Sequence, residues 1–113
     1  MKIYPNPKCS KSREALNLIK KNTSKFEIVE YLKVPLIFDE IKLIIDKIKL
    51  KPIEIIRKNE NDWKEDYANR EMNENDIINA IVKNPKLLER PIIISDKGAV
   101  VGRPPKNVLT LFN

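Results

Sequence analysis

The first third of the chain alternates between two spacings of apolar residues. Residues 2–4 form a short extended run that stops at Pro5, because proline lacks the backbone N–H that a strand uses. Residues 10–21 place apolar side chains at helical spacing, and residues 26–31 are rich in β-branched and aromatic types. The pattern therefore predicts a strand, a helix and a second strand.

The middle third predicts mainly helix. Residues 38–50 carry a clear apolar stripe, and Pro52 can open a further short helix that ends near residues 57–59. Asn73 is a suitable N-cap, supported by Asp76, for a helix that closes at Asn84-Pro85, with a short helical turn over 86–89. The polar segment 60–72 has no periodicity that favours one structure, and its Trp63 and Tyr67 are expected to anchor a loop on the helices.

The last third predicts two strands and a helix. β-branched residues at 92–94 and the run 99–101 flank a tight turn in which Gly98 can supply a positive φ. Residues 104–112 then predict a final helix. The order of elements indicates an α/β fold, a small four-stranded sheet with helices on it, and residues 1–113 are expected to form one domain.

Composition narrows the class of protein. Of 113 residues, 42% are hydrophobic and 34% are charged, which is typical of a soluble globular protein, and no apolar run approaches the roughly 20 residues of a membrane span. The N-terminus has no apolar signal core, so we expect a cytoplasmic location. Two glycines leave no Gly-rich phosphate loop. The chain has no histidine, which excludes His-based triads and most zinc sites, and no metal is predicted.

The net charge of +6 does not by itself indicate a nucleic-acid partner. The 22 basic residues are interleaved with 16 acidic ones. In the lysine-rich stretch 42–51 the lysines alternate with isoleucines, as on the solvated face of an amphipathic helix. Nucleic acid is therefore an unlikely partner and no membrane interaction is predicted.

The single cysteine is the first candidate for chemistry. Cys9 directly precedes the first predicted helix, where unpaired N–H groups and the helix dipole stabilise a thiolate. Lys8, Lys11 and Arg13 add positive charge to the same turn, and these flanking residues make deep burial awkward. A small buried hydrophobe is the alternative for a lone cysteine, but the setting favours a reactive thiol.

Three arginines stand where the pattern of elements breaks. Arg57 follows a helix, Arg90 precedes a strand and Arg103 follows a strand. A guanidinium suits the binding of an oxyanion because it presents a fixed fork of donors with a permanent charge. Taken singly, each is typical of a surface ion pair, and their spacing does not show that they converge.

Four segments in register resemble the ArsC/Spx family, which contains the glutaredoxin-coupled arsenate reductases. They are Tyr4-Pro5-Asn6-Pro7-Lys8-Cys9-Ser10-Lys11-Ser12-Arg13, Ile56-Arg57-Lys58-Asn59, Glu89-Arg90-Pro91-Ile92-Ile93 and Gly102-Arg103-Pro104. The resemblance covers essentially the whole chain. It implies a thioredoxin-like fold with a four-stranded mixed sheet, a helical insertion between the second and third strands, and a cis-proline at Pro91.

The resemblance also implies the roles of individual residues. Cys9 would be the nucleophile. Arg57, Arg90 and Arg103 would surround the arsenic oxyanion. The supporting residues would be Asn6, Ser12, Arg13 and Pro91. Pro5 stands where characterised relatives often carry histidine, so Lys8, Arg13 and the helix terminus are expected to keep the thiol ionised.

The implied reaction is the reduction of arsenate by an oxidoreductase that binds no cofactor. Glutathione would serve as co-substrate and glutaredoxin as partner, because Ser12 occupies the position of a second cysteine and one thiol cannot resolve its own disulfide. Ser12 is expected to hydrogen-bond the thiolate or to cap the helix.

Two other functions fit the same residues. One is a regulator like those of the Spx branch, which bind RNA polymerase; the missing Cys-x-x-Cys switch and the arginine set argue against it. The other is a general monothiol oxidoreductase linked to glutathione, in which the same pocket accepts glutathione and no arsenate. A disulfide-reduction assay without arsenate separates this function from arsenate reduction.

Overall fold

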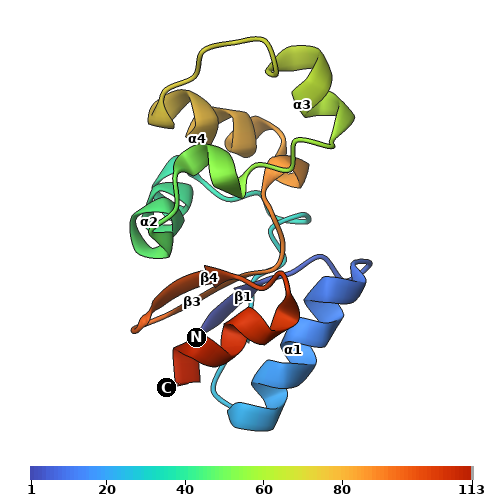
Figure 1. Cartoon of the computed structure of the whole chain (residues 1–113), viewed down its shortest axis with the longest axis vertical. Coiled ribbons are helices and arrows are strands. Elements are labelled where there is room, and N and C mark those ends of the chain that lie inside the picture. The colour runs from blue at the N-terminus through green and yellow to red at the C-terminus, as the bar shows by residue number, and fades with distance from the viewer. Residues whose placement is uncertain (113) are drawn as a thin grey trace.

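The computed structural model describes residues 1–112 and contains four strands, four α-helices and three 3₁₀ segments over that range (Figure 1). In chain order they are β1 (Lys2–Tyr4), α1 (Ser10–Asn22), β2 (Glu27–Ile28), α2 (Phe38–Ile48), η1 (Pro52–Ile55), α3 (Asn61–Asp66), α4 (Glu74–Lys83), η2 (Pro85–Leu87), β3 (Ile92–Ser95), β4 (Gly98–Val101) and η3 (Pro105–Phe112).

The strands form one mixed sheet in the order β2-β1-β3-β4. β1 pairs with β2 in parallel and with β3 antiparallel, with Ile3 opposite Ile93 in the second pairing. β3 and β4 form the predicted hairpin, and its turn residue Gly98 has a φ of 136°. The predicted four-stranded mixed sheet is confirmed, and the helices from α2 to α4 are inserted between β2 and β3 as expected.

Alternation along the sheet divides the core between its two faces. Ile3 and Ile93 point toward α1 and η3, where they are buried with Ala15 and Ile19. The side chains of the opposite face belong to a larger cluster with the helical insertion, listed here by its sheet members: Tyr4, Ile92, Ile94 and Ala99. In Figure 1 the sheet accordingly lies between α1 with η3 on one side and the inserted helices on the other. The ends of the strands that face the insertion are where the candidate site lies.

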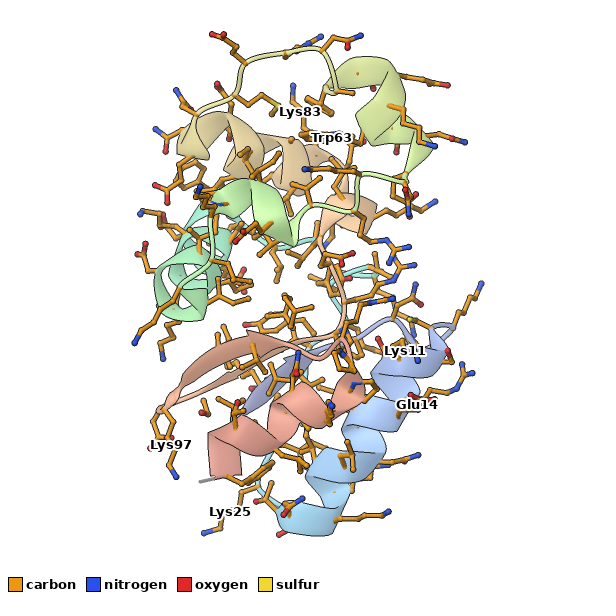
Figure 2. The ribbon with its side chains drawn as sticks, in the orientation of Figure 1. Lys11, Glu14, Lys25, Trp63, Lys83 and Lys97 are labelled. Atoms are coloured by element: carbon orange, nitrogen blue, oxygen red, sulfur yellow. The ribbon has the colours of Figure 1, made fainter. Side chains whose placement is uncertain are left out.

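An aromatic pair, Trp63 and Tyr67, attaches α3 to the rest of the helical insertion. Trp63 of α3 is 7% exposed, and its ring stacks on Tyr67 with centroids 5.8 Å apart (Figure 2). The Tyr67 hydroxyl accepts a hydrogen bond from Asn84 Nδ2 at 3.2 Å, which joins this segment to the end of α4. These contacts explain the anchoring role expected for the two aromatic residues.

Helix α4 begins as the sequence predicts. The Asn73 side chain accepts a hydrogen bond from the Asp76 N–H at 2.8 Å, and the Asp76 carboxylate accepts one from the Asn73 N–H at 3.1 Å. This reciprocal arrangement satisfies two N–H groups that a helix N-terminus otherwise leaves unpaired. The buried face of α4 then packs against α2.

Three elements differ from the prediction. β2 covers only Glu27–Ile28 rather than 26–31, because its partner β1 is three residues long and ends at Tyr4, before Pro5. Segment 60–72 contains the helix α3, whose single buried residue gives no helical periodicity. The final helix is a 3₁₀ segment, and its Asn107 N–H donates to the Pro104 carbonyl three residues earlier.

Ion pairs join charged side chains on the outer surfaces of the helices. Figure 2 shows Lys11 and Glu14 on the outer side of α1, where they form an ion pair at 3.8 Å. Lys42 links two helices of the insertion, through Asp46 at 2.9 Å and Glu74 at 3.2 Å. Within residues 1–112, no helix combines the length and the apolar character needed to cross a membrane.

Candidate active site

The loop before α1 is organised by Asn6. Its carbonyl accepts the Cys9 N–H at 2.9 Å and its side-chain oxygen accepts the Lys8 N–H at 3.0 Å. The Asn6 N–H donates to the Ser12 hydroxyl at 3.1 Å, and Ser12 is 1% exposed. Arg13 adds a bond from Nη1 to the Pro7 carbonyl at 2.9 Å. Asn6, Ser12 and Arg13 therefore shape the turn that presents the thiol.

Cys9 is the N-cap of α1 and is half-buried. Burial raises the pKa of the thiol, but the backbone N–H groups of Ser12 and Lys11, the charge of Arg103 and a hydrogen-bonding contribution from Arg90 lower it by more. The net pKa lies below the ordinary value, as the position at a helix N-terminus favours.

The charges expected around the thiol act differently from the prediction. The Lys11 side chain pairs with Glu14, and its contribution to the thiol comes from its backbone N–H. The Arg13 guanidinium bonds the Pro7 carbonyl. The cationic side chains that lower the Cys9 pKa belong instead to arginines distant in sequence, Arg103 and Arg90.

Arg103 makes the direct contact with the sulfur. Its Nη2 lies 3.1 Å from Cys9 Sγ, and its Nε donates to the Arg90 carbonyl at 2.6 Å. The bond to the Arg90 carbonyl holds the guanidinium in place. The positive charge of Arg103 therefore stays next to the sulfur independently of the Cys9 contact. A charge-assisted contact of this kind favours the thiolate over the thiol.

Gly102 allows the approach that places Arg103. Its N–H donates to the Pro91 carbonyl at 2.8 Å, which extends the β3–β4 pairing by one step. A Cβ at this position would lie 2.8 Å from Pro91 Cγ and 3.3 Å from Ala15 Cβ, so only glycine fits without displacement. The Arg90–Pro91 peptide bond is cis, as the resemblance implied, and the Arg103–Pro104 bond is cis as well.

Arg57 is brought toward the Arg90 segment by a short antiparallel backbone pairing outside the sheet. Its N–H donates to the Leu87 carbonyl at 2.7 Å, next to an isolated bridge between Ile56 and Leu88. This pairing brings the end of η1 beside the segment that leads into Arg90. The Arg57 side chain is ion-paired, with Glu60 at 3.3 Å and with Glu89 at 3.7 Å.

Two of the three predicted arginines lie on the wall of one cavity of about 360 Å³. Arg57 and Arg103 line it together with Glu89, and its remaining lining residues are Ile53, Glu54, Ile56, Lys58 and Asn59. Three cationic and two acidic side chains give the cavity a positive excess beside the thiol contact of Arg103. A small oxyanion is the type of ligand that such a set of fixed donors binds.

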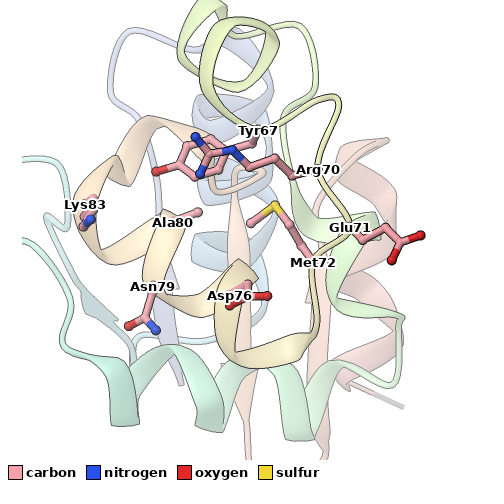
Figure 3. A pocket seen from close by; sticks show the side chains of 8 residues that line it. All are labelled: Tyr67, Arg70, Glu71, Met72, Asp76, Asn79, Ala80 and Lys83. Carbon is pink, nitrogen blue, oxygen red and sulfur yellow. The ribbon is translucent and has the colours of Figure 1, made fainter.

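A second cavity lies in the helical insertion. It has a volume of about 240 Å³ and lies between α4 and segment 67–72, where Figure 3 shows the Arg70 side chain against the Tyr67 ring. The Arg70 guanidinium carbon is 5.6 Å from the ring centroid. Two acidic residues, Glu71 and Asp76, balance its two cationic ones. It therefore lacks the positive excess of the first cavity, and its arginine rests on a tyrosine ring, whereas Arg103 contacts the thiol.

The structure brings most of the predicted site residues together. Arg103 and Arg90 act on Cys9 directly, whereas Arg57 shares the cavity and is held by two carboxylates. The sequence reasoning missed those carboxylates, although the spacing of Glu60 three residues after Arg57 and the place of Glu89 in the quoted motif could have indicated them. It also missed Tyr31, whose electrostatic partners are Arg90, Arg57 and Cys9.

Comparisons with known proteins agree with this geometry. A family model described as the ArsC family matches residues 4–111. The uncharacterized protein YfgD of Escherichia coli K12 is 41% identical over 113 residues, which cover 98% of this chain and 95% of YfgD. An arsenate reductase of Neisseria meningitidis serogroup B is 36% identical over 110 residues, covering 96% and 94%. The solved structure of an arsenate reductase from Vibrio cholerae superposes with a TM-score of 0.90 at 33% identity and 97% coverage of both chains. The fold is thioredoxin-like, and the chain belongs to the ArsC family.

Proposed function

We propose that this protein is an arsenate reductase in which the Cys9 thiolate attacks arsenate and glutathione completes the reduction. One observation carries the proposal: the 3.1 Å contact between Arg103 Nη2 and Cys9 Sγ joins an activated thiol to a cavity with excess positive charge. The relatives named arsenate reductase support oxidoreductase chemistry for the family. The thiol and the arginines supply the two groups that this reaction needs, a nucleophile and an anion site.

The first step forms a bond between sulfur and arsenic. The Cys9 thiolate attacks arsenate, and one arsenate oxygen leaves as water after protonation. Attack of one anion on another is opposed by charge repulsion, which the guanidiniums of Arg90 and Arg103 offset near the sulfur. Arg57 offers further donors from the wall of the cavity. Arsenic is still in the +5 state in this adduct.

The second step transfers the electrons. Glutathione attacks the adduct, and a disulfide between Cys9 and glutathione forms as arsenic leaves in the +3 state as arsenite. Two thiolates become one disulfide, which supplies the two electrons. The chain has a single cysteine, so an external thiol is required at this step. Glutaredoxin then attacks the glutathione sulfur and releases the Cys9 thiolate.

The test is arsenate-dependent oxidation of NADPH in the presence of glutathione, glutaredoxin and glutathione reductase. Cys9→Ser is expected to abolish turnover, because a serine hydroxyl is not ionised near neutral pH. Omission of glutaredoxin should leave at most one turnover per protein molecule. Wild-type rates in Cys9→Ser would contradict the assignment of the nucleophile.

The same reagents distinguish the alternative activity. A folded protein that turns over a low-molecular-weight disulfide with glutathione, but gives no arsenate-dependent signal, would be a general glutathione-linked oxidoreductase. A protein inactive in both assays that binds RNA polymerase would be a regulator. Either result would contradict arsenate reduction while leaving the family membership unchanged.

A further inference from the structure

Tyr31 is a buried polar residue that the reaction described above does not use. Its side chain is 0% exposed, and within residues 1–112 no hydrogen bond of good geometry reaches its hydroxyl. Burying a hydroxyl without a partner costs free energy, and phenylalanine would fill the same space without that cost. The hydroxyl at this position therefore needs an explanation other than packing.

The backbone holds this side chain toward the interior. The Tyr31 N–H donates to the Val29 carbonyl at 2.9 Å, just after β2. The Glu30 carbonyl accepts two N–H groups, from Lys33 and Val34, both at 3.0 Å, which close the turn around Tyr31. The ring belongs to the core cluster between the sheet and the helical insertion. Tyr31 is thus a fixed group with little freedom to turn away.

The groups that face the hydroxyl belong to the candidate active site. Arg90, Arg57 and Cys9 are its electrostatic partners. Burial raises the pKa of Tyr31 to about 12, although the two arginines oppose the shift, so the hydroxyl is neutral and can both donate and accept. Arg90 makes a hydrogen-bonding contribution to the Tyr31 hydroxyl and another to the Cys9 thiol, so its side chain is a neighbour of both groups.

Arg90 has an unpartnered atom of its own. Its Nε is buried and receives no hydrogen bond of good geometry from the residues that the structure describes. Its carbonyl, in contrast, is fixed by Arg103 Nε at 2.6 Å. Two buried polar atoms from neighbouring side chains, the Tyr31 hydroxyl oxygen and Arg90 Nε, therefore lack a well-formed hydrogen bond next to Cys9. Unsatisfied groups of this kind are rare in the interior and often occur where a ligand completes the arrangement.

We infer that Tyr31 is a positioning residue for the oxyanion site, its hydroxyl being the polar group that orients the Arg90 guanidinium toward an anion bound beside Cys9. The inference rests on the proposed function only in requiring that the site bind an oxyanion. When the anion is bound, the Arg90 fork faces its oxygens, and the hydroxyl supports the guanidinium from the core side. Tyr31 itself does not touch the sulfur or the anion.

The test measures anion binding without turnover. Arsenate, phosphate and sulfate, each added separately, should slow the alkylation of Cys9 by iodoacetamide, and the half-protecting concentration reports affinity. Tyr31→Phe is expected to raise that concentration about tenfold, the size of effect typical of losing a hydrogen bond to a charged group. Protection in each variant is measured relative to its own alkylation rate without anion, because Arg90 also contributes to the pKa of Cys9.

Tyr67→Phe is the matched control. It also removes one tyrosine hydroxyl, which accepts a part-buried hydrogen bond in the helical insertion rather than at the site. Its half-protecting concentrations should equal those of the wild type. Equal protection in Tyr31→Phe and the wild type, with both proteins folded by thermal melting, would overturn the inference.

A double-mutant cycle tests whether Tyr31 acts through Arg90. If it does, adding Tyr31→Phe to Arg90→Lys should cost little further affinity, because the orientation of the guanidinium is already lost. A full tenfold further loss would overturn the inference. If none of the three anions protects wild-type Cys9, the inference also fails. If anions protect but arsenate is not reduced, the proposed function fails and the positioning role stands.

Discussion

The cavity beside Cys9 and the cavity between α4 and segment 67–72 hold their arginines in opposite ways. Beside Cys9, the Arg103 guanidinium is fixed by a backbone carbonyl at one nitrogen and contacts a thiol with another. In the helical insertion, Arg70 is exposed and rests on the face of Tyr67. The first arrangement directs donors at a nucleophile, whereas the second covers an aromatic ring. A cationic side chain near a cavity therefore indicates an anion site only when its orientation is fixed.

Two parts of the chain have different roles, one in the chemistry of the site and one in stability. The N-cap of α1 and the segments that flank β3 and β4 carry Cys9, Arg90 and Arg103, whose interactions bear on a reactive atom. The contacts of α3 and α4 are stacking, capping and apolar packing. We therefore expect changes in the insertion to affect stability, and changes at the strand ends to affect chemistry.

The largest effect is expected from Trp63→Ala. The ring is 7% exposed and stacks on Tyr67, so its removal leaves a cavity and should cost about 3 to 5 kcal/mol of unfolding free energy. Denaturant unfolding measures this loss. The alkylation rate of Cys9 per folded molecule should not change, and Trp63→Phe should retain most of the stability. A Trp63→Ala variant that is stable but unreactive at Cys9 would break the division of roles.

The next effect is expected from Arg103→Ala. It removes the donor that contacts the sulfur and should lower kcat/KM in the arsenate assay by about 10² to 10³, as the loss of a positioned anion donor typically does. Arg70→Ala is the matched control, because it also removes one arginine from the wall of a cavity. Its activity should remain within about twofold of the wild type. The exposed cation–π contact that it removes contributes on the order of 1 kcal/mol, and it contributes to stability rather than to catalysis. Similar losses in both variants would show that net charge, rather than geometry, governs activity.

The sequence predicted the parts of this comparison that depend on local chemistry. The apolar stripe of α2 and the N-cap of α4 are encoded by neighbouring residues, and both elements are present as predicted. Helix α3 was not predictable because only Trp63 of its six residues is buried, which leaves no period to detect. The placement of Cys9 at a helix N-terminus followed from the pattern around it.

The convergence of the arginines could not be predicted from spacing. Arg103 and Cys9 are 94 positions apart, and the sheet and the packing of α1 against η3 bring their segments together. Only the family resemblance placed them in one site. The carboxylates on Arg57 and the buried hydroxyl of Tyr31 depend on packing between elements, so neither had a clear signal in the pattern of residues.

Gly102→Ala should have an intermediate effect on stability. The added Cβ would meet Pro91 Cγ at 2.8 Å and Ile93 Cδ1 at 3.2 Å, both on buried residues that cannot move freely. Overpacking of this kind costs about 1 to 3 kcal/mol, and thermal or denaturant unfolding would measure it. Because the shift must also move Arg103, arsenate protection of Cys9 should weaken in the same variant. Unchanged protection would mean that the position of Arg103 is set independently of its neighbour.

The smallest effect is expected in the pH dependence of stability. Burial raises the Cys9 pKa, but the N–H groups of Ser12 and Lys11 and the nearby arginines lower it by more, so the folded thiol has a lower pKa than the unfolded one. The resulting stabilisation is fully present above the pKa of the unfolded thiol and is lost as the pH falls through that of the folded thiol. Under reducing conditions, the melting temperature of the wild type should therefore rise relative to that of Cys9→Ser as the pH increases from the pKa of the folded thiol to that of the unfolded thiol.

The same titration in an Arg103→Ala background sharpens the comparison between the cavities. Without the guanidinium, the folded pKa should move up toward the ordinary value, and the window in which the wild-type thiol adds stability should narrow. Arg70→Ala should leave the window unchanged, because Arg70 lines the other cavity. The pH profile of Cys9 alkylation checks the same shift by a kinetic route, since only the thiolate reacts. A midpoint that Arg103→Ala does not move would assign the ionisation of Cys9 to the backbone N–H groups of α1 and to Arg90.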